Sequence, residues 1–301
     1  MRIAGIVLYN PDLCRLRENI KTVSQQVDEL VLVDNGSSNI GGIVELIDML
    51  HIQIEDSDST SIYLIENSEN LGIAKALNQI LLYAKGHRYE WVLSLDQDSV
   101  IQPGLLDSYE QFIDDEGKRN RLEGRLAMLT AIYQDRNSDL IPKTHGEYEE
   151  VSECITSASY ANIDLLLSVG GYDEEMFIDY VDYDMCASLK EKGYSIVRIN
   201  RIGLIHEVGK AQTVCLLGSK TNVHHESAFR KYYQVRNHIY YIRKHKRSVK
   251  KWVEYRRVIK LFMLTILYET DRKRKLSAMI KGVKDSRKMF VSNRITGENS
   301  E

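Results

Sequence analysis

Two aspartates spaced two residues apart could hold a divalent cation. Asp96 and Asp98 follow the apolar run Trp91–Leu95. Carboxylate oxygens suit Mg²⁺ or Mn²⁺, and such a cation could neutralise the charge on a diphosphate leaving group. A solvated turn with Asp98 as a helix cap would explain a lone pair of acids equally well. The metal interpretation gains weight from a second strand-end acid, Asp34, while His206 is a candidate nitrogen ligand, although a lone histidine is more often structural.

Asp34 and Asn35 stand in a polar, glycine-containing turn after the apolar run Val31–Val33. Ligands of open α/β sheets collect at the carboxyl ends of the strands, so Asp34 is placed to accept hydrogen bonds from a base or a ribose. An Asx turn that caps the next helix is the alternative interpretation.

A third polar segment contains Asn70 and Gly72 and leads into a predicted helix, with Lys75 one turn inside it. A helix N-terminus and a lysine side chain could both bind phosphate groups. The segment is not a Walker loop, because GxxxxGK[ST] is absent. A helix that carries an ordinary surface lysine remains the alternative.

Six acidic residues lie within the twelve positions from Asp173 to Asp184, interleaved with Phe177, Tyr180 and Tyr183. The aromatic side chains favour burial, so an acid held among them could act as a general base. Acids that simply decorate the start of a helix are the alternative.

The elements that must position these residues alternate between short β-rich runs and helical patterns, which is typical of βα units on a mostly parallel sheet. The predicted strands are Ile3–Tyr9, Leu30–Val33, Ile62–Ile65 and Trp91–Leu95. Apolar spacing predicts helices at Leu13–Gln26, Ile43–Leu50 and Ile73–Ala84. We therefore expect an open, Rossmann-like α/β sheet with helices on both faces.

After about residue 120 the alternation weakens. The sequence predicts, in order, a strand at Leu126–Tyr133, a polar connection at Thr144–Glu153, a short helix at Asp182–Lys192 and a strand at Ser195–Ile199. From about Ser227 the pattern becomes long, basic and helical.

The charge is divided unevenly along the chain. Residues 230–289 contain 20 Lys and Arg against 4 Asp and Glu, whereas the rest of the chain contains 20 against 39. The acidic part would repel nucleic acid, and no helix-turn-helix or zinc signature accompanies the basic part. We therefore expect no nucleic-acid partner.

Cysteine usage and hydropathy indicate a cytoplasmic protein. The four cysteines form no CxxC pair, so they predict reduced thiols rather than zinc ligands or disulfides. The opening run Met1–Leu8 is too short for a signal peptide, and Leu261–Leu267 is too short to cross a bilayer.

Taken in order, these segments resemble the family 2 glycosyltransferases of the GT-A fold over roughly residues 3 to 240. Residues 7–10 (VLYN) resemble the first strand of the family, residues 33–37 (VDNGS) its nucleotide-binding turn, and Asn70, Gly72 and Asn78 its following loop and helix. Three signatures resemble rhamnosyltransferases of bacterial polysaccharide assembly: 95–99 (LDQDS), 177–182 (FIDYVD) and 230–237 (RKYYQVRN).

The resemblance implies an inverting transfer of rhamnose from dTDP-rhamnose, with Mg²⁺ or Mn²⁺, to an acceptor sugar on a lipid carrier or growing glycan. It implies a catalytic domain at residues 1–229 and a basic helical region at residues 230–301. It further implies that Asp98 and His206 hold the metal. The implied donor-binding residues are Tyr9, Asp34, Asn35, Asn70, Lys75, Asp96, Gln97, Arg230, Tyr233, Arg236 and Asn237.

The resemblance places the general base in the acidic segment. Asp182 matches the family's base and is the better candidate. Many relatives have a Glu-Asp pair where this chain has Val181 and Asp182, so Asp179 stays in contention.

Other functions remain as alternatives. A family 2 enzyme with a UDP-sugar donor, or a nucleotidyltransferase on a similar sheet, would use the same paired acids. A Rossmann dehydrogenase is disfavoured because GxGxxG is missing after the first strand.

The basic C-terminal segment predicts attachment to the inner face of the plasma membrane. Its Lys and Arg clusters flank apolar residues between Val258 and Leu267, with Trp252 and Tyr255 suited to an interface. Packing of these helices on the acidic body, or pairing of two subunits in a homodimer, is the alternative.

Overall fold

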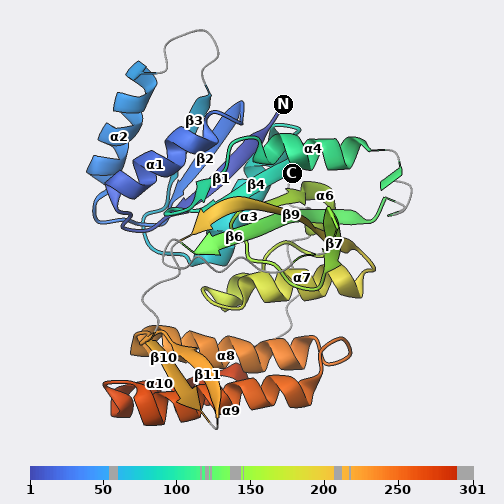
Figure 1. Ribbon diagram of the computed structural model, residues 1–301. Helices are drawn as coiled ribbons and strands as arrows, with labels where there is room; N and C mark the ends of the chain where they lie inside the picture. The colour runs from blue at the N-terminus through green and yellow to red at the C-terminus, as the bar shows by residue number, and fades with distance from the viewer. Residues whose placement is uncertain are drawn as a thin grey trace, which may run out of the picture.

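The computed structural model describes residues 1–53, 60–115, 124–135, 146–206, 212–216 and 218–289, together with the single positions 117, 118, 122 and 144. A mixed sheet with helices on both faces forms the upper part of the molecule in Figure 1, and a layer of three helices lies below it. No helix in these ranges is both long enough and apolar enough to cross a membrane.

Four parallel strands form the first half of the sheet, in the order β3-β2-β1-β4. They are β1 (Ile3–Leu8), β2 (Glu29–Asp34), β3 (Ser61–Glu66) and β4 (Trp91–Asp96). The intervening helices are α1 (Leu13–Val23), α2 (Ile40–Gln53) and α3 (Ile73–Gly86). The predicted βα alternation is confirmed. Strands β1, β2 and β4 are almost wholly apolar because helices cover both of their faces.

The sheet continues beyond β4 in the order β8-β6-β9-β5, and β8 runs antiparallel to both of its neighbours. These strands are β5 (Val100–Ile101), β6 (Leu126–Asp135), β8 (Ser159–Asn162) and β9 (Ser195–His206). Strand β7 (Tyr148–Val151) pairs with β9 within the stretch predicted as a polar connection, so that prediction was wrong. Its sequence YEEV is half exposed and carries two acids, so it lacks the apolar pattern that reveals a strand.

Shorter helices connect the strands of the second half. They are α4 (Leu105–Asp114), α6 (Ile163–Ser168), the 3₁₀ turn η1 (Glu174–Met176) and α7 (Val181–Glu191). Helix α7 confirms the helix predicted at Asp182–Lys192.

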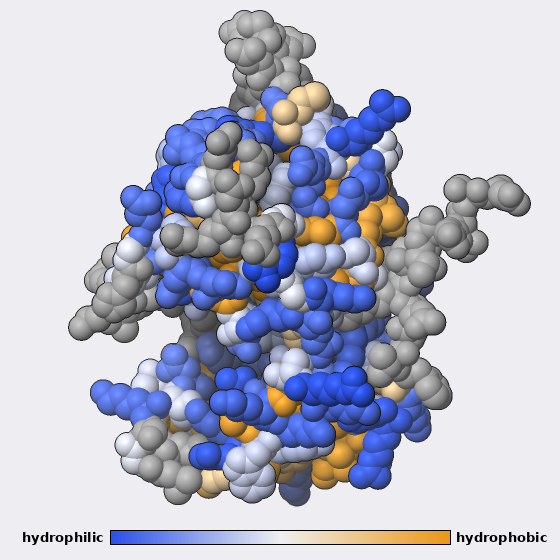
Figure 2. Space-filling model, turned by 90° about the vertical axis from the view of Figure 1, so that its right-hand side faces the viewer, coloured by the Kyte–Doolittle hydropathy of each residue, from blue (hydrophilic) through white to orange (hydrophobic). Residues whose placement is uncertain are grey.

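The basic C-terminal segment forms α8 (Ala228–Lys244), α9 (Lys251–Tyr268) and α10 (Arg272–Ser286). A hairpin of β10 (Gln212–Leu216) and β11 (Ser219–Val223) packs on α9 through Val214, Val223 and Leu264. Figure 2 shows that the surface of this helical layer is largely hydrophilic, interrupted by hydrophobic patches.

Part of the basic charge is neutralised inside the molecule. Lys244 of α8 is ion-paired with Asp173 and lies 2.7 Å from Asp184, which joins α8 to the acidic segment before and within α7. Glu269 is buried between Lys231 at 2.6 Å and Lys275 at 2.7 Å. Packing of basic helices on the acidic body, the alternative to membrane attachment, therefore occurs through α8.

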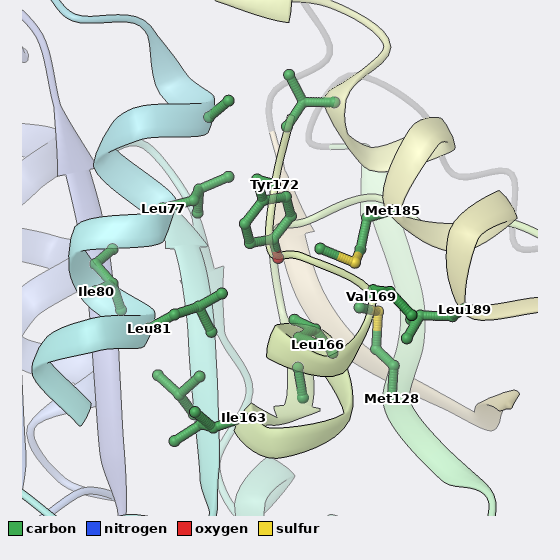
Figure 3. Packing of buried hydrophobic residues seen from close by; sticks show 14 of the residues in the cluster. Leu77, Ile80, Leu81, Met128, Ile163, Leu166, Val169, Tyr172, Met185 and Leu189 are labelled. Carbon is green, nitrogen blue, oxygen red and sulfur yellow. The ribbon is translucent and has the colours of Figure 1, made fainter. Parts of the chain in front are cut away.

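Two hydrophobic clusters lie on opposite faces of the sheet. One joins α1, α2 and α4 to inward residues such as Ile6 and Leu32. The other joins α3, α6 and α7, and Figure 3 shows Leu77 of α3 facing Tyr172 and Leu166 across it. Together the two clusters hold the strands rigidly, so that their carboxyl ends form a fixed edge for the polar residues.

The four cysteines are free. Two of them nevertheless meet in this second cluster, where the sulfurs of Cys154 and Cys186 lie 3.8 Å apart. That separation exceeds a disulfide bond length of about 2.05 Å.

Candidate active site

The parallel strands bring the first two acidic positions to one edge of the sheet. Strand β1 pairs with β2 on one side, where Leu8 lies opposite Asp34, and with β4 on the other, where Val7 lies opposite Asp96. The two aspartates therefore flank the end of β1, as the sequence predicted from the ends of separate strands.

Asp34 is 2% exposed. Its side chain forms an Asx turn, which was the alternative interpretation to ligand binding. Its Oδ2 accepts hydrogen bonds from the backbone N–H groups of Gly36 and Ser37, at 3.1 and 3.0 Å. Its Oδ1 is buried without a hydrogen-bond partner in the described part of the chain. A buried carboxylate oxygen without a partner calls for a donor, which a bound water or a ligand would supply.

Asn35 and Asn70 bind each other. The Asn35 amide donates to Asn70 Oδ1 and to the carbonyl of Gly72, both at 3.1 Å, and its own Oδ1 accepts from the backbone N–H of Leu71 at 3.0 Å. These bonds fix the loop between β3 and α3 against the end of β2. The donor-binding roles predicted for both asparagines remain predictions.

The start of α3 faces the acidic segment. The backbone N–H of Ile73 donates to the carbonyl of Phe177 at 2.6 Å, and Lys75 lies 3.0 Å from Glu174. Gly72 has a φ of +87°, and a Cβ there would lie 2.8 Å from the Phe177 backbone. The predicted phosphate-binding helix end is therefore joined to the segment predicted to hold the base.

Gln97 ties two loops of the site together. Its Oε1 accepts from the backbone N–H of Tyr9 at 2.8 Å, while the Tyr9 ring is half exposed. The preceding residue, Asp96, is anchored through its backbone, whose carbonyl accepts from Asn19 at 2.7 Å and whose N–H donates to Ser157 Oγ at 3.2 Å.

The sheet register brings the backbones of Asp98 and His206 to neighbouring positions, while their predicted role as metal ligands remains a prediction. Strand β5 runs antiparallel to the end of β9, with Val100 opposite Ile205. Asp98 lies in the turn two residues before Val100, and His206 follows Ile205 at the end of β9. The residue types suit a divalent cation, although the His206 side chain is outside the described atoms. Among the side chains that are described, no group of three or more His, Cys, Asp or Glu residues is arranged to hold a metal ion.

A pocket of about 630 Å³ opens where the acidic segment meets the sheet. Three predicted acids, Asp96, Asp179 and Asp182, line it together with Arg230. The remaining lining residues are Ile73, Tyr133, Ile155, Thr156, Ile178, Tyr180, Val181, Tyr183, Gln234, His238, Arg257 and Leu261.

Asp182 lies half-buried in the first turn of α7, where its Oδ1 accepts from the Tyr183 N–H at 2.9 Å. The pKa of Asp182 is raised from 3.8 to about 6, mainly by burial and with the negative charges of Asp96 and Asp179 acting in the same direction, although backbone N–H groups oppose the rise. A carboxylate with a pKa near neutral pH accepts a proton more readily than an ordinary aspartate.

Asp179 differs from Asp182 in its surroundings. Arg230 of α8 donates to Asp179 Oδ1 at 2.8 Å, so this carboxylate belongs to an ion pair within the pocket. The backbone of Asp179 is left-handed, with a φ of +65°. Both features hold its side chain in one orientation.

Side chains of residues 230–237, the third sequence signature, hydrogen-bond to the backbone around residues 177–182, the second signature. Asn237 is fully buried, and its amide donates to the carbonyls of Met176, Ile178 and Asp179 at 2.6, 2.7 and 2.9 Å. The guanidinium of Arg236 donates to the Glu175 carbonyl at 2.6 Å. These side chains hold the acidic segment in place, and their predicted contacts with donor or acceptor remain untested.

Tyr233 contributes to the same support. Its ring stacks on Phe177 with the ring centres 5.1 Å apart, and Arg236 lies 4.6 Å above the ring. The aromatic contact thus joins α8 to the acidic segment, and the cation–π contact within α8 holds the Tyr233 ring.

Several pocket residues carry no clear functional signal in the sequence. Arg257 and Leu261 come from α9, where nothing distinguished them from other basic and apolar residues of the segment. His238 had a weak signal, since it directly follows the third signature; its ring stacks on Tyr180 at 4.4 Å and bonds to Glu254 at 2.8 Å.

Residues 4–127 match the family model described as "Glycosyl transferase family 2". Over 288 residues the chain is 28% identical to the dTDP-rhamnosyl transferase RfbF of Shigella flexneri. The alignment covers 93% of this chain and 92% of the relative.

Solved structures share the fold at low sequence identity. S. aureus TarS 1-349 in complex with UDP-GlcNAc superposes with a TM-score of 0.60 at 16% identity, covering 95% of this chain and 81% of that one. GalNAc-T7 with UDP, GalNAc and Mn²⁺ gives a TM-score of 0.57 at 13% identity, covering 96% of this chain and 56% of that one. The sheet and the solved structures show that the chain has a GT-A-like fold, and its residues 4–127 are similar to the family 2 glycosyltransferases.

Proposed function

We propose that this enzyme is an inverting, metal-dependent rhamnosyltransferase that moves L-rhamnose from dTDP-rhamnose to an acceptor sugar of a bacterial cell-surface polysaccharide. The observation that carries the proposal is the position of Asp182, whose raised pKa suits a base and which shares its pocket with Asp96 and Arg230. The similarity to a dTDP-rhamnosyl transferase along nearly the whole chain supports the donor.

In this proposal Asp182 is the general base. It takes the proton of the acceptor hydroxyl as that oxygen bonds to the anomeric carbon and the carbon–oxygen bond to the diphosphate breaks. The Tyr183 N–H occupies Oδ1 of Asp182, which leaves Oδ2 as the oxygen for the proton. Inversion requires one displacement only, so no covalent nucleophile is needed.

Other residues of the chain bind the donor. The buried Oδ1 of Asp34 accepts a hydrogen bond from the thymine base or the ribose, while Asp96 lies between the nucleotide turn and the pocket. Asp98 and His206 would hold the divalent cation, which when bound neutralises charge on the departing diphosphate. Arg230 keeps Asp179 in its ion pair and adds positive charge to the pocket wall.

A ligand panel tests the donor assignment. We expect dTDP-rhamnose with Mn²⁺ to raise the melting temperature more than UDP-GlcNAc, UDP-glucose or dTDP-glucose, because a tightly bound ligand stabilises the folded state by mass action. A shift with the UDP-sugars alone would replace the proposed donor. Release of pyrophosphate from nucleoside triphosphates would instead favour a nucleotidyltransferase.

The metal role is tested with Asp98→Ala. We expect this variant to lose the Mn²⁺-dependent part of donor affinity in calorimetry while keeping a cooperative melting transition. Asp48→Ala, which removes an exposed carboxylate on α2, is the matched control and should bind donor normally. Unchanged Mn²⁺-dependent affinity in Asp98→Ala would refute the metal assignment.

A further inference from the structure

Helix α9 exposes a stripe of large apolar side chains. Trp252, Tyr255, Ile259 and Ile266 follow one another at steps of three, four and seven residues, which places them on one face of the helix. Trp252 is 74% exposed and Ile259 is 56% exposed, and the other two are also exposed. We call these four residues the α9 stripe.

The stripe is not what attaches α9 to the protein. The side chains of α9 that pack inward are Glu254, Val258, Leu264 and Thr265, all buried, and Glu254 bonds to His238 of α8. A surface row of large apolar groups that contributes nothing to the core is typical of an interaction site.

The charges beside the stripe are all of one sign. Helix α9 has four exposed charged side chains, and all are basic: Lys251, Arg256, Arg257 and Lys260. Its single acid, Glu254, is buried. Arg256 and Lys260 directly follow Tyr255 and Ile259, so they border the stripe along one side.

Exposed aromatic and apolar residues beside basic residues indicate the kind of partner. Tryptophan and tyrosine favour the boundary between lipid and water, and basic side chains are attracted to anionic headgroups. A second copy of the chain fits poorly, because the usual twofold dimer would place the basic border of one subunit near the same border of the other. We propose that the α9 stripe docks on an anionic lipid bilayer, with α9 lying in the plane of the interface.

The geometry also connects docking to the pocket. Arg257 and Leu261, which line the pocket, belong to the same helix as the stripe. A docked α9 would hold the pocket within about one helix diameter, roughly 10–12 Å, of the bilayer surface. That placement suits an acceptor carried on a lipid. Docking itself does not depend on the donor or on catalysis, so it can be tested apart from the proposed function.

Co-sedimentation with vesicles tests the apolar part. We expect the wild-type protein to bind vesicles of phosphatidylcholine and phosphatidylglycerol, and Trp252→Ser/Ile259→Ser to bind at least about tenfold more weakly. The matched control is Met49→Ser/Leu82→Ser, which removes apolar residues of similar exposure from α2 and α3 and should bind like wild type. All four positions are exposed, so circular dichroism should show native folding in both variants.

A second pair of variants tests the charge. Arg256→Gln/Lys260→Gln should weaken binding to anionic vesicles by about thirtyfold at low salt, with a smaller effect at high salt. Arg17→Gln/Lys21→Gln has the same four-residue spacing on exposed positions of α1 and should bind like wild type. An equal loss in both pairs would show attraction by net charge alone and overturn the assignment to α9.

Fluorescence gives an independent readout. The chain has two tryptophans, so Trp91→Phe leaves Trp252 as the reporter. We expect its emission to shift to shorter wavelength with anionic vesicles but not with pure phosphatidylcholine. Equal binding to both vesicle types, or binding to neither, would overturn the proposal. So would a dimer in analytical ultracentrifugation that Trp252→Ser/Ile259→Ser converts to monomer, since a second subunit would then cover the stripe.

Discussion

Replacing Asp182 by asparagine should make the protein more stable and nearly inactive at the same time. The substitution keeps the shape of the side chain and removes its charge. In the native structure burial disfavours that charge, and Asp96 and Asp179 add repulsion. Asparagine avoids this cost but cannot accept the acceptor proton.

The size and sign of the stability change follow from the pKa. A rise from 3.8 to about 6 corresponds to about 3 kcal/mol, at about 1.36 kcal/mol per pH unit. The native state binds the proton more tightly than the unfolded chain, so wild-type stability falls as pH rises from 3.8 through about 6. Because Asp182 is only half-buried, screening by water reduces the effect, and we expect a gain of about 1–3 kcal/mol for Asp182→Asn at pH 8. Below pH 3.8 the gain should vanish.

Urea denaturation at pH 4, 6 and 8 measures this change in stability. The protein must be free of metal, because a cation near Asp96 would lower the pKa of Asp182. In the activity assay with Mn²⁺, wild-type kcat/KM should fall about tenfold per pH unit below the pKa of the base. Asp182→Asn should lose about 10²–10⁴-fold in kcat with little change in donor affinity, and the acid limb should disappear.

Asp179→Asn is the internal control. It should have a milder effect on kcat, and it should lower stability, because it removes the charge that pairs with Arg230 at 2.8 Å and leaves Arg230 paired with Glu226 at 3.2 Å. Lower stability of Asp182→Asn at pH 8, or an acid limb that persists in this variant, would refute the assignment of Asp182. Reversed effects of the two variants on kcat would move the base to Asp179.

Three further predictions concern the supports of the site. Asn237→Ala should destabilise the fold by about 2–4 kcal/mol, measured by urea denaturation, since it removes the buried amide that donates to the carbonyls of Ile178 and Asp179; a loss of donor affinity at unchanged stability would argue for ligand binding instead. Gly72→Ala should lower the melting temperature, with a cost of about 1–3 kcal/mol for its left-handed backbone alone; a wild-type melting curve would contradict the close contact. Burial opposes ionisation of Glu269, but hydrogen bonds from Lys231 and Lys275 outweigh it and lower its pKa. The stability that Glu269 contributes should therefore be lost as pH falls through that lowered pKa. Glu269→Ala should lower the free energy of unfolding by about 3–5 kcal/mol at pH 7, and a much smaller decrease in calorimetry would disprove this.

Local patterns were enough to predict the first half of the fold. Strands β1, β2 and β4 are runs of buried apolar residues, and their helices repeat apolar residues at helical spacing. Both patterns depend on neighbours within a few residues, so they are legible in the sequence. Strands β7 and β8 carry no such pattern, because their four residues each are held mainly by pairing with distant strands.

The sequence by itself determined which residue types could do the chemistry: aspartates at the ends of parallel strands, an acidic aromatic segment and a basic helical end. Only the tertiary structure decided which of these residues line the pocket and which hold other residues in place. Asn237 donates hydrogen bonds to backbone carbonyls about 60 positions earlier in the chain, and Arg230 binds Asp179, so the predicted ligand-binding signature also supports the pocket. The contrast between Asp179 and Asp182 has the same origin. A carboxylate's pKa depends on burial and on charges nearby in space, and neither is encoded in its immediate sequence neighbours.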